Sequence, residues 1–296
     1  MRPILFSLTP ELPLQVPLRT ALGADAGAFQ TRRFPDGETY LRVVSAVTNR
    51  HCVVLVNLVE PDAQFLPLAF LAATLKELGA ASVGLVAPYL SYMRQDTRFQ
   101  SGEAVTSRVF AGLLSEQVDW LITVDPHLHR YRRLDDIYSI PTSVVPGAPA
   151  LARWFARQEG PLLLVGPDSE SEQWVSAIAR EIGQPYVVGG KERRGDRDVV
   201  VSLPDLSQYK NRRAVIVDDV ISSGHTILKT LDALFAAGMK QVDCVAVHGI
   251  FAEGVDERLT RDGVETLVTT NSVPHASNGI DLSPYLADAV RGRLPR

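Results

Sequence analysis

The sequence predicts an α/β protein whose parallel β-sheets are flanked by helices. Short apolar runs rich in Val, Ile and Leu recur along the chain and alternate with amphipathic stretches of helix length. That alternation is typical of buried parallel strands joined by crossover helices. The chain has 296 residues, about twice the length of a typical domain, and 46% of them are hydrophobic. We therefore expect two α/β domains, each large enough for a core of its own.

The individual elements follow from this periodicity. Helices are expected at 64–78 and 223–238, where apolar residues recur at helical spacing and Gly79 and Gly238 mark the ends. Each helix lies between two expected strands and is therefore a crossover connection. The strands are expected at the apolar runs 52–57, 82–87, 119–124, 161–165, 213–217 and 242–248.

A domain boundary is expected near the middle of the chain. Residues 139–142, Ser-Ile-Pro-Thr, lie between two strand–helix series and follow the charged stretch 130–136. The proline and the charged stretch favour a boundary over a continued element. We therefore place one domain at 1–142 and the other at 143–296.

Charge and composition exclude several classes of function. The net charge of −4 argues against a general surface for nucleic acid or anionic membranes, since such surfaces need many Lys and Arg. Neither a signal peptide nor an apolar stretch of about 18 residues is present, so neither export nor a membrane span is expected. Cys52 and Cys244 lie in apolar runs, which favours buried thiols over a disulfide or a thiolate metal site. A cytoplasmic location is expected.

The segment 215–226 carries the strongest chemical signal. A buried strand leads into two acids and a small hydroxylated turn before a helix, with the residues Asp218, Asp219, Ser222, Ser223, Gly224, His225 and Thr226. Free backbone N–H groups and the dipole at a helix start favour an anion, and Ser and Thr hydroxyls add donors. The pattern predicts a phosphate site, with the acids facing sugar hydroxyls or a metal-bound diphosphate. The alternative, a Ser that only caps the helix, explains Ser223 but not the paired acids.

Three segments of the first half carry groups suited to a nucleotide or a metal, and each has a plainer alternative. Residues 33–38, Arg-Phe-Pro-Asp-Gly-Glu, are by themselves an ordinary turn sequence. Residues 88–96 hold Tyr and Arg side chains, which either grip a base and its phosphates or form a surface aromatic patch. His127 and His129 follow an apolar run, and their alternative is a metal pair such as the zinc sites of hydrolases.

Two segments of the second half follow strands in the same way. Asp168 comes shortly after the apolar run 161–165 and is, from the residues alone, a turn acid. The charged, Gly-containing stretch 188–197 includes Lys191 and Arg193 and is, by itself, a solvated loop with plausible mobility.

In this order and spacing, the segments resemble the ribose-phosphate diphosphokinase family, the phosphoribosyl pyrophosphate synthetases, over nearly the whole chain. Residues 215–226 resemble the phosphoribosyl-diphosphate motif that the family shares with phosphoribosyltransferases, whereas 33–38, 88–96 and 124–127 are similar to segments of the diphosphokinases alone. The resemblance implies two domains of phosphoribosyltransferase type. It also implies an enzyme of nucleotide biosynthesis that transfers the diphosphate of ATP to the anomeric hydroxyl of ribose 5-phosphate, with AMP as the second product.

The same resemblance implies roles for individual residues. Magnesium would lie near His127 and Asp168, and Lys191 and Arg193 would be the catalytic cations of a mobile loop. The residues for ATP would be Phe34, Asp36, Glu38, Arg94, Gln95, Asp96 and His127. Those for ribose 5-phosphate would be Asp218, Asp219, Ser222, Ser223, Gly224, His225 and Thr226. In this family the 33–38 segment reaches the adenine of a neighbouring subunit's ATP, so a dimer-based homo-oligomer is expected, with ATP in the cleft between the domains.

Some residues depart from the family pattern, and alternatives stay open. Residues 221–226 and 98–104 differ from the commoner bacterial sequences and are closer to archaeal-type members. The alternatives are a purine or pyrimidine phosphoribosyltransferase and, in another class, a nucleotide-binding regulatory subunit without activity. The two-domain length and the first-half motifs favour the diphosphokinase. Neither a Gly-x-x-x-x-Gly-Lys-Ser/Thr nor a Gly-x-Gly-x-x-Gly motif occurs, so no P-loop kinase or dinucleotide dehydrogenase is predicted.

Overall fold

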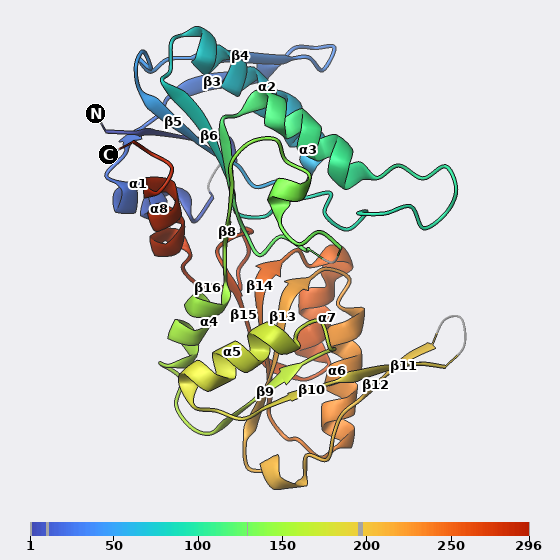
Figure 1. The fold of residues 1–296 in the computed structure, drawn as a ribbon. Coiled ribbons are helices and arrows are strands. Elements are labelled where there is room, and N and C mark those ends of the chain that lie inside the picture. Colours follow the sequence, from blue (N-terminus) through green and yellow to red (C-terminus); the bar gives the residue numbers. More distant parts are fainter. Residues whose placement is uncertain (1, 10–11, 129, 195–197, 296) are drawn as a thin grey trace. The chain divides into compact units, whose positions relative to one another are not determined.

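The computed structural model describes residues 2–9, 12–128, 130–194 and 198–295, which fold into two compact units (Figure 1). The first unit comprises Met1–Pro146, Ser272–Pro274 and Leu282–Arg296, and the second comprises Gly147–Asn271 and His275–Asp281. The chain therefore leaves the first unit near its middle and returns to it at the C-terminus.

A six-stranded parallel sheet forms the centre of the first unit, in the spatial order β2-β1-β5-β6-β7-β8. All five residues of β7 are buried, which is why this strand is a continuous apolar run rather than an alternating one. The strands are β1 (Ile4–Ser7), β2 (Asp25–Ala26), β5 (His51–Leu55), β6 (Ser82–Ala87), β7 (Trp120–Val124) and β8 (Thr142–Val145).

Four helices and an antiparallel hairpin complete the first unit. Leu68, Leu71 and Leu75 of α2 are buried in the same core as the strand residues. The helices are α1 (Gln15–Leu22), α2 (Pro61–Glu77), α3 (Thr106–Gln117) and α8 (Ser283–Arg291), with a 3-10 turn at Leu134–Asp136. The hairpin consists of β3 (Phe29–Arg33) and β4 (Thr39–Val43).

The second unit repeats the architecture with a parallel sheet in the order β10-β9-β13-β14-β15-β16. Its strands are β9 (Leu162–Gly166), β10 (Tyr186–Val188), β13 (Arg213–Ile221), β14 (Val242–Gly249), β15 (Val264–Thr270) and β16 (Asn278–Ile280). Its helices are α4 (Ala148–Phe155), α5 (Glu172–Ile182), α6 (His225–Ala236) and α7 (Val255–Arg261), with 3-10 turns at Ser207–Tyr209 and Ala252–Gly254. An antiparallel hairpin, β11 (Gly190–Arg194) with β12 (Asp198–Ser202), projects from this unit (Figure 1).

The predicted fold class and strands are confirmed, and two features differ from expectation. Each of the six predicted apolar runs overlaps a strand, and α2 and α6 are the two predicted helices. The stretch 188–197 was expected to be a loop, but Gly190–Arg194 pairs with Asp198–Ser202 as a hairpin. The contacts also group Leu282–Arg296 with the first unit, which a single cut between 142 and 143 does not do.

The buried cysteines agree with the sequence analysis. Cys52 and Cys244 are both buried and free, as predicted, and burial raises the pKa of the Cys52 thiol to about 11. Burial also raises the pKa of the Cys244 thiol. Within the described ranges, no helix combines the length and the apolar character that crossing a bilayer requires.

The C-terminal helix closes the first unit through both apolar and polar contacts. Leu286 and Val290 of α8 are fully buried, and α8 packs against α1. Beyond the helix, Arg293 Nη2 donates to Ser143 Oγ at 2.7 Å. The last residues of the chain therefore stabilise an element formed by the first residues.

We predict that Leu286→Ala destabilises the first unit by about 2–5 kcal/mol, because it leaves a cavity between α8 and the sheet. Hydrogen exchange should quicken in α1, about 270 residues away in sequence. Asp288→Ala is the control, because it removes an exposed ion pair with Arg291 on the same helix but no buried apolar contact, so it should change the stability little. Unchanged exchange in α1 of the Leu286 variant would show that α8 does not support it.

Candidate functional site

The winding of the second sheet reverses between β9 and β13. From β9 the chain moves to the edge strand β10, whereas from β13 it moves the other way through β14 to β15. In open α/β sheets, ligands bind at the carboxyl ends of the strands where the winding reverses. The recorded pairing of β13 with β9 ends at Ile216, while β13 continues beside β14 to Ile221. The residues that follow β9 and the last residues of β13 therefore define the candidate site.

Three carboxylates gather at this switch point. Asp168 follows β9, and Asp218 and Asp219 belong to the part of β13 that extends past β9. Burial raises the pKa of the Asp218 carboxyl well above its usual value, and the charges of Asp219 and Asp168 raise it further. The backbone N–H of Asp219, which donates to Asp218 Oδ1 at 3.0 Å, acts in the opposite direction. Because like charges repel in these surroundings, the site favours a bound cation or hydroxyl donors.

The turn between β13 and α6 has the geometry of an anion site. Gly224 is the N-cap residue with φ 68°, and as a glycine it has no side chain with which to cap α6. Ser223, which the plainer interpretation made a helix cap, instead hydrogen-bonds through Oγ to His225 Nδ1 at 2.9 Å. The first N–H groups of α6 and the helix dipole favour an anion at this turn.

The chain passes close to the acid turn just before the β11–β12 hairpin. The N–H of Gly189 donates to the carbonyl oxygen of Gly166 at 2.8 Å. A Cβ placed on Gly189 would lie 2.7 Å from the carbonyl oxygen of Pro167, so only glycine permits this approach. The hairpin therefore starts beside the turn that carries Asp168.

Lys191 and Arg193 lie on β11 of this hairpin. They occupy alternate positions, opposite Val201 and Val199. Arg194, the next residue of β11, pairs with Asp198. The backbone thus places the two predicted catalytic residues on one element that begins at the switch point.

In the first unit, the candidate ATP residues follow two neighbouring strands. Arg94, Gln95 and Asp96 come after β6, and His127 comes after β7. Asp96 is only 4% exposed, and its Oδ1 accepts a hydrogen bond from Arg130 Nη1 at 2.6 Å. Asp96 therefore ties the two connections together from inside, whereas Arg94 is exposed to solvent.

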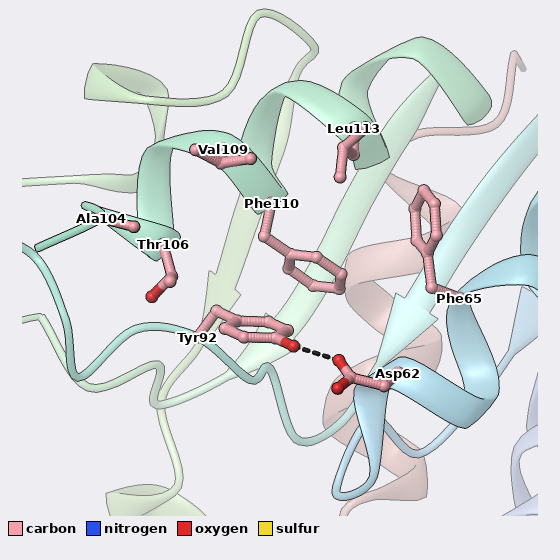
Figure 2. Close-up of a pocket in the computed structure, with 8 residues that line it drawn as sticks. All are labelled: Asp62, Phe65, Tyr92, Ala104, Thr106, Val109, Phe110 and Leu113. Carbon is pink, nitrogen blue, oxygen red and sulfur yellow. Dashed lines mark hydrogen bonds between the residues drawn. The ribbon is translucent and has the colours of Figure 1, made fainter.

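The side chain of Tyr92, in the same segment, is directed toward Asp62 and Phe110 (Figure 2). Its hydroxyl donates to Asp62 of α2, and its ring centroid lies 4.7 Å from that of Phe110 of α3. The bond to Asp62 and, to a smaller degree, burial raise the pKa of Tyr92. Its φ of 61° is unusual for a residue with a side chain, which shows that these contacts hold the backbone in a strained conformation.

The side chains around Tyr92 line a cavity of about 390 Å³ (Figure 2). The lining is largely apolar and consists of Asp62, Phe65, Tyr92, Ala104, Thr106, Val109, Phe110 and Leu113. Such a lining does not suit a triphosphate, which needs cations and N–H donors. Tyr92 thus anchors the segment to α2 and α3. The residue of this segment that suits a phosphate is the exposed Arg94.

Phe34, Asp36 and Glu38 form the tip of the β3–β4 hairpin. The N–H of Phe34 donates to the carbonyl oxygen of Glu38 at 2.8 Å, and the N–H of Glu38 donates to Asp36 Oδ1 at 3.2 Å. The Arg32 guanidinium lies 4.4 Å from the centre of the Phe34 ring, which is itself 37% exposed. The turn expected from the sequence is present, and it displays an aromatic ring and two acids to solvent.

A metal site is suggested by charge rather than by a complete set of ligands. Across the described ranges, no three His, Cys, Asp or Glu side chains are grouped as a ready-made metal site. His127 belongs to the first unit and Asp168 to the second. His129, whose role the sequence left open, lies outside the described residues. Magnesium typically binds one or two protein carboxylates together with substrate phosphates, so the carboxylates at the switch point fit this ion when a phosphate ligand accompanies it.

Two residues that shape these regions were not singled out by sequence. Arg130 pairs with Asp96, and its only signal in the sequence is a basic residue three positions after His127. Val255 packs so close to the phosphate turn that a Cβ on Gly224 would lie 2.1 Å from Val255 Cγ2. No local pattern indicates that contact, because the two residues are brought together only by the sheet.

Family models match both halves of the chain. Residues 4–117 match the N-terminal domain of ribose phosphate pyrophosphokinase, and residues 135–283 match the phosphoribosyl transferase domain. A solved structure of phosphoribosylpyrophosphate synthetase from Mycobacterium smegmatis covers 99% of each chain with a TM-score of 0.86 at 22% identity. That likeness confirms the predicted fold, two phosphoribosyltransferase-like units.

Curated relatives extend the similarity to sequence. A ribose-phosphate pyrophosphokinase from Saccharolobus solfataricus is 32% identical over 247 residues, which cover 82% of this chain and 84% of the relative. Another from Methanobrevibacter smithii is 31% identical over 283 residues, which cover 91% of this chain and 94% of the relative. Both relatives are archaeal, in agreement with the loop sequences. The chain belongs to the ribose-phosphate pyrophosphokinase family, as its motifs predicted.

Proposed function

We propose that the protein is a ribose-phosphate diphosphokinase of nucleotide biosynthesis, which makes phosphoribosyl diphosphate and AMP from ATP and ribose 5-phosphate. The anomeric hydroxyl oxygen of the sugar forms a bond to the β-phosphorus of ATP. The bond from that phosphorus to the α,β-bridging oxygen breaks, AMP leaves with the electron pair, and the hydroxyl proton is lost. The observation that carries the proposal is the phosphate turn beside three carboxylates at the switch point of the second sheet.

The turn from Ser222 to Thr226 is the proposed anchor of ribose 5-phosphate. Its helix-start N–H groups and hydroxyls are donors for the three phosphate oxygens, and Gly224 permits both the left-handed backbone of the turn and the close packing of Val255 behind it. Asp218 and Asp219 then accept hydrogen bonds from the ribose hydroxyls. These contacts fix the anomeric oxygen for in-line attack, and positioning of this kind supplies much of the catalysis of phosphoryl transfer.

Magnesium is the proposed cofactor, with Asp168 and His127 as its protein neighbours. When bound, the ion neutralises phosphate charge and orients the triphosphate. The clustering of Asp168, Asp218 and Asp219 supports this role, because their mutual repulsion is relieved by a cation. The scarcity of other grouped ligands in the described part of the chain agrees with an ion that takes much of its coordination from phosphate oxygens and water.

Lys191 and Arg193 are the proposed catalytic cations. Both occupy alternate positions of β11, in a hairpin that begins beside the Asp168 turn, and this placement supports a role in neutralising the charge on the transferred diphosphate and the leaving AMP. Fixed positive charges at this point stabilise the transition state more than the bound substrates.

ATP is proposed to bind through Phe34, Asp36 and Glu38 of the hairpin tip and through Arg94, Gln95, Asp96 and His127. The buried Asp96 acts within this set by holding Arg130. The exposed ring of Phe34 supports a dimer-based homo-oligomer in which one subunit contributes this tip to another subunit's ATP site. A cytoplasmic location completes the proposal.

The direct test incubates the purified protein with magnesium, ATP and ribose 5-phosphate and follows AMP and phosphoribosyl diphosphate by chromatography. We expect both products in equal amounts, and none when the magnesium is chelated. Nucleotide binding without AMP would favour the regulatory subunit. Consumption of added phosphoribosyl diphosphate with a purine or pyrimidine base would favour the transferase.

The first prediction for the site concerns Gly224. Gly224→Ala should greatly weaken ribose 5-phosphate binding, since the new Cβ would meet Val255 Cγ2 at 2.1 Å and φ is 68°. Gly224→Ala combined with Val255→Ala should recover part of the affinity, because the steric clash is removed while the backbone strain stays. Calorimetric titration with ribose 5-phosphate measures both. Wild-type affinity in a folded Gly224→Ala protein would remove the turn from the site.

The second prediction concerns the hairpin cations. Lys191→Ala and Arg193→Ala should each lower kcat by about a hundredfold to a thousandfold, or about 3–4 kcal/mol, with much smaller changes in KM. Arg194→Ala is the matched control, because it removes the same charge from the neighbouring position of β11 and should leave kcat nearly unchanged. Equal effects at all three positions would indicate general electrostatic attraction rather than catalysis.

A further inference from the structure

The phosphate turn is backed by a loop from a distant part of the chain. The N–H groups of Ile250 and Phe251 donate to the carbonyl oxygen of Ile221 at 2.9 and 3.1 Å, and that of Ala252 donates to Ser222 at 3.0 Å. The loop that follows β14, residues 250–254, is called the backing loop. Through these bonds it holds the end of β13 and the first residue of the turn. The position of the turn therefore depends on the position of this loop.

This backing loop is strained and closely packed. Phe251 has φ 50° and Glu253 has φ 59°, values that side chains make unfavourable. After the loop, Val255 begins α7 and packs against Gly224, where even a methyl group would not fit. A strained loop keeps such a conformation only where surrounding contacts fix it.

His275 supplies contacts of this kind from a third segment. Its ring centroid lies 4.2 Å from that of Phe251, and its Nε2 lies 3.2 Å from Asp256 Oδ2 in the first turn of α7. The His275 side chain thus contacts both the loop, at Phe251, and the helix that follows it, at Asp256. His275 and Asp256 are each partly buried, so the bond between them is less screened than one at the surface.

The neighbours of His275 fix its proton. The backbone N–H of Ser277 donates to His275 Nδ1 at 3.1 Å, so Nδ1 is the acceptor nitrogen and the proton of the neutral ring lies on Nε2, facing Asp256. The remaining bonds run in one direction: Asn278 Nδ2 donates to Thr269 Oγ1, Thr269 to Ser277 Oγ, and Ser277 to His275 Nδ1. This chain of hydrogen bonds begins at Asn278, beside the end of β15, and ends at Asp256.

We infer that the Asp256–His275 pair is a positioning device for the phosphate turn. It holds Phe251 and the start of α7, and through them the bonds to Ile221 and Ser222 and the contact of Val255 with Gly224. The inference rests on the proposed role of that turn in binding ribose 5-phosphate. His275 and Asp256 are not among the residues proposed to bind substrate, so we assign their effect on the sugar phosphate to the loop that they hold.

The same residues do not form a nucleophile site, although Ser277, His275 and Asp256 are the types found in hydrolases. A catalytic base must be free to take the serine proton. The single Nδ1 lone pair of His275 is shared between the backbone N–H and the hydroxyl of Ser277, within one tight turn. Ser277 Oγ is also held by Thr269 at 2.8 Å. These bonds suit a rigid support.

The test is calorimetric titration of the full chain with ribose 5-phosphate and, separately, with a non-hydrolysable ATP analogue. His275→Ala and Asp256→Ala should each weaken ribose 5-phosphate binding about fivefold, the equivalent of one lost hydrogen bond of ~1 kcal/mol, and leave the ATP analogue unaffected. His275→Gln should restore most of the affinity, because its amide can donate to Asp256 as Nε2 does. The double variant should be no weaker than either single one, since the two residues act as a unit.

Glu257→Ala is the matched control, because Glu257 is an exposed acid in the same first turn of α7. Like Asp256→Ala, Glu257→Ala removes a negative charge from the start of the α7 dipole. Ribose 5-phosphate should nevertheless bind to this variant as it does to the wild type. Equal affinity in all variants, additive effects in the double variant, or an equal loss for Glu257→Ala would overturn the inference. If His275→Ala does not fold, Asp256→Ala and His275→Gln decide. Failure of the wild-type protein to bind ribose 5-phosphate would instead overturn the proposed function.

Discussion

The reversal of winding between β9 and β13 is the constraint on which the rest of the site depends. Because neighbouring strands lead their connections in opposite directions, no crossover covers the point between them. Asp168 and Asp218 meet there, and burial makes the repulsion between their charges costly. The phosphate turn, the hairpin of Lys191 and Arg193 and the backing loop at Phe251 are all arranged around this charged edge.

The first unit has the same sheet but uses it differently. Its winding reverses between β1 and β5, whereas the candidate ATP residues follow β6 and β7, farther along the sheet. Asp96 and Arg130 join those two connections, and Tyr92 anchors the first of them to α2 and α3. Two copies of one architecture can therefore present different ligand-binding groups, because the loops and not the sheet carry the chemistry.

The sequence predicted what local periodicity and turn chemistry encode. The apolar runs became strands, and the acids, hydroxyls and glycine of 215–226 lie where expected, because these features depend on neighbours in the chain. The sequence did not predict the β11–β12 hairpin, because backbone pairing between the two strands forms despite the charged composition of the segment. Nor did it predict that α8 belongs to the first unit. Nor could it identify His275, since a bond to Asp256 and a ring contact with Phe251 arise only from tertiary packing.

The central claim is that the carboxylates at the switch point serve the sugar phosphate rather than the fold, and Asp218→Asn tests it most directly. The amide keeps the oxygen that accepts the N–H of Asp219 but removes the repelled charge, so the melting temperature should stay the same or rise. Calorimetry should show at least a tenfold loss of ribose 5-phosphate affinity, roughly the value of a charged hydrogen bond, with an ATP analogue bound as before. Wild-type affinity for ribose 5-phosphate, or a marked loss of stability, would contradict the account.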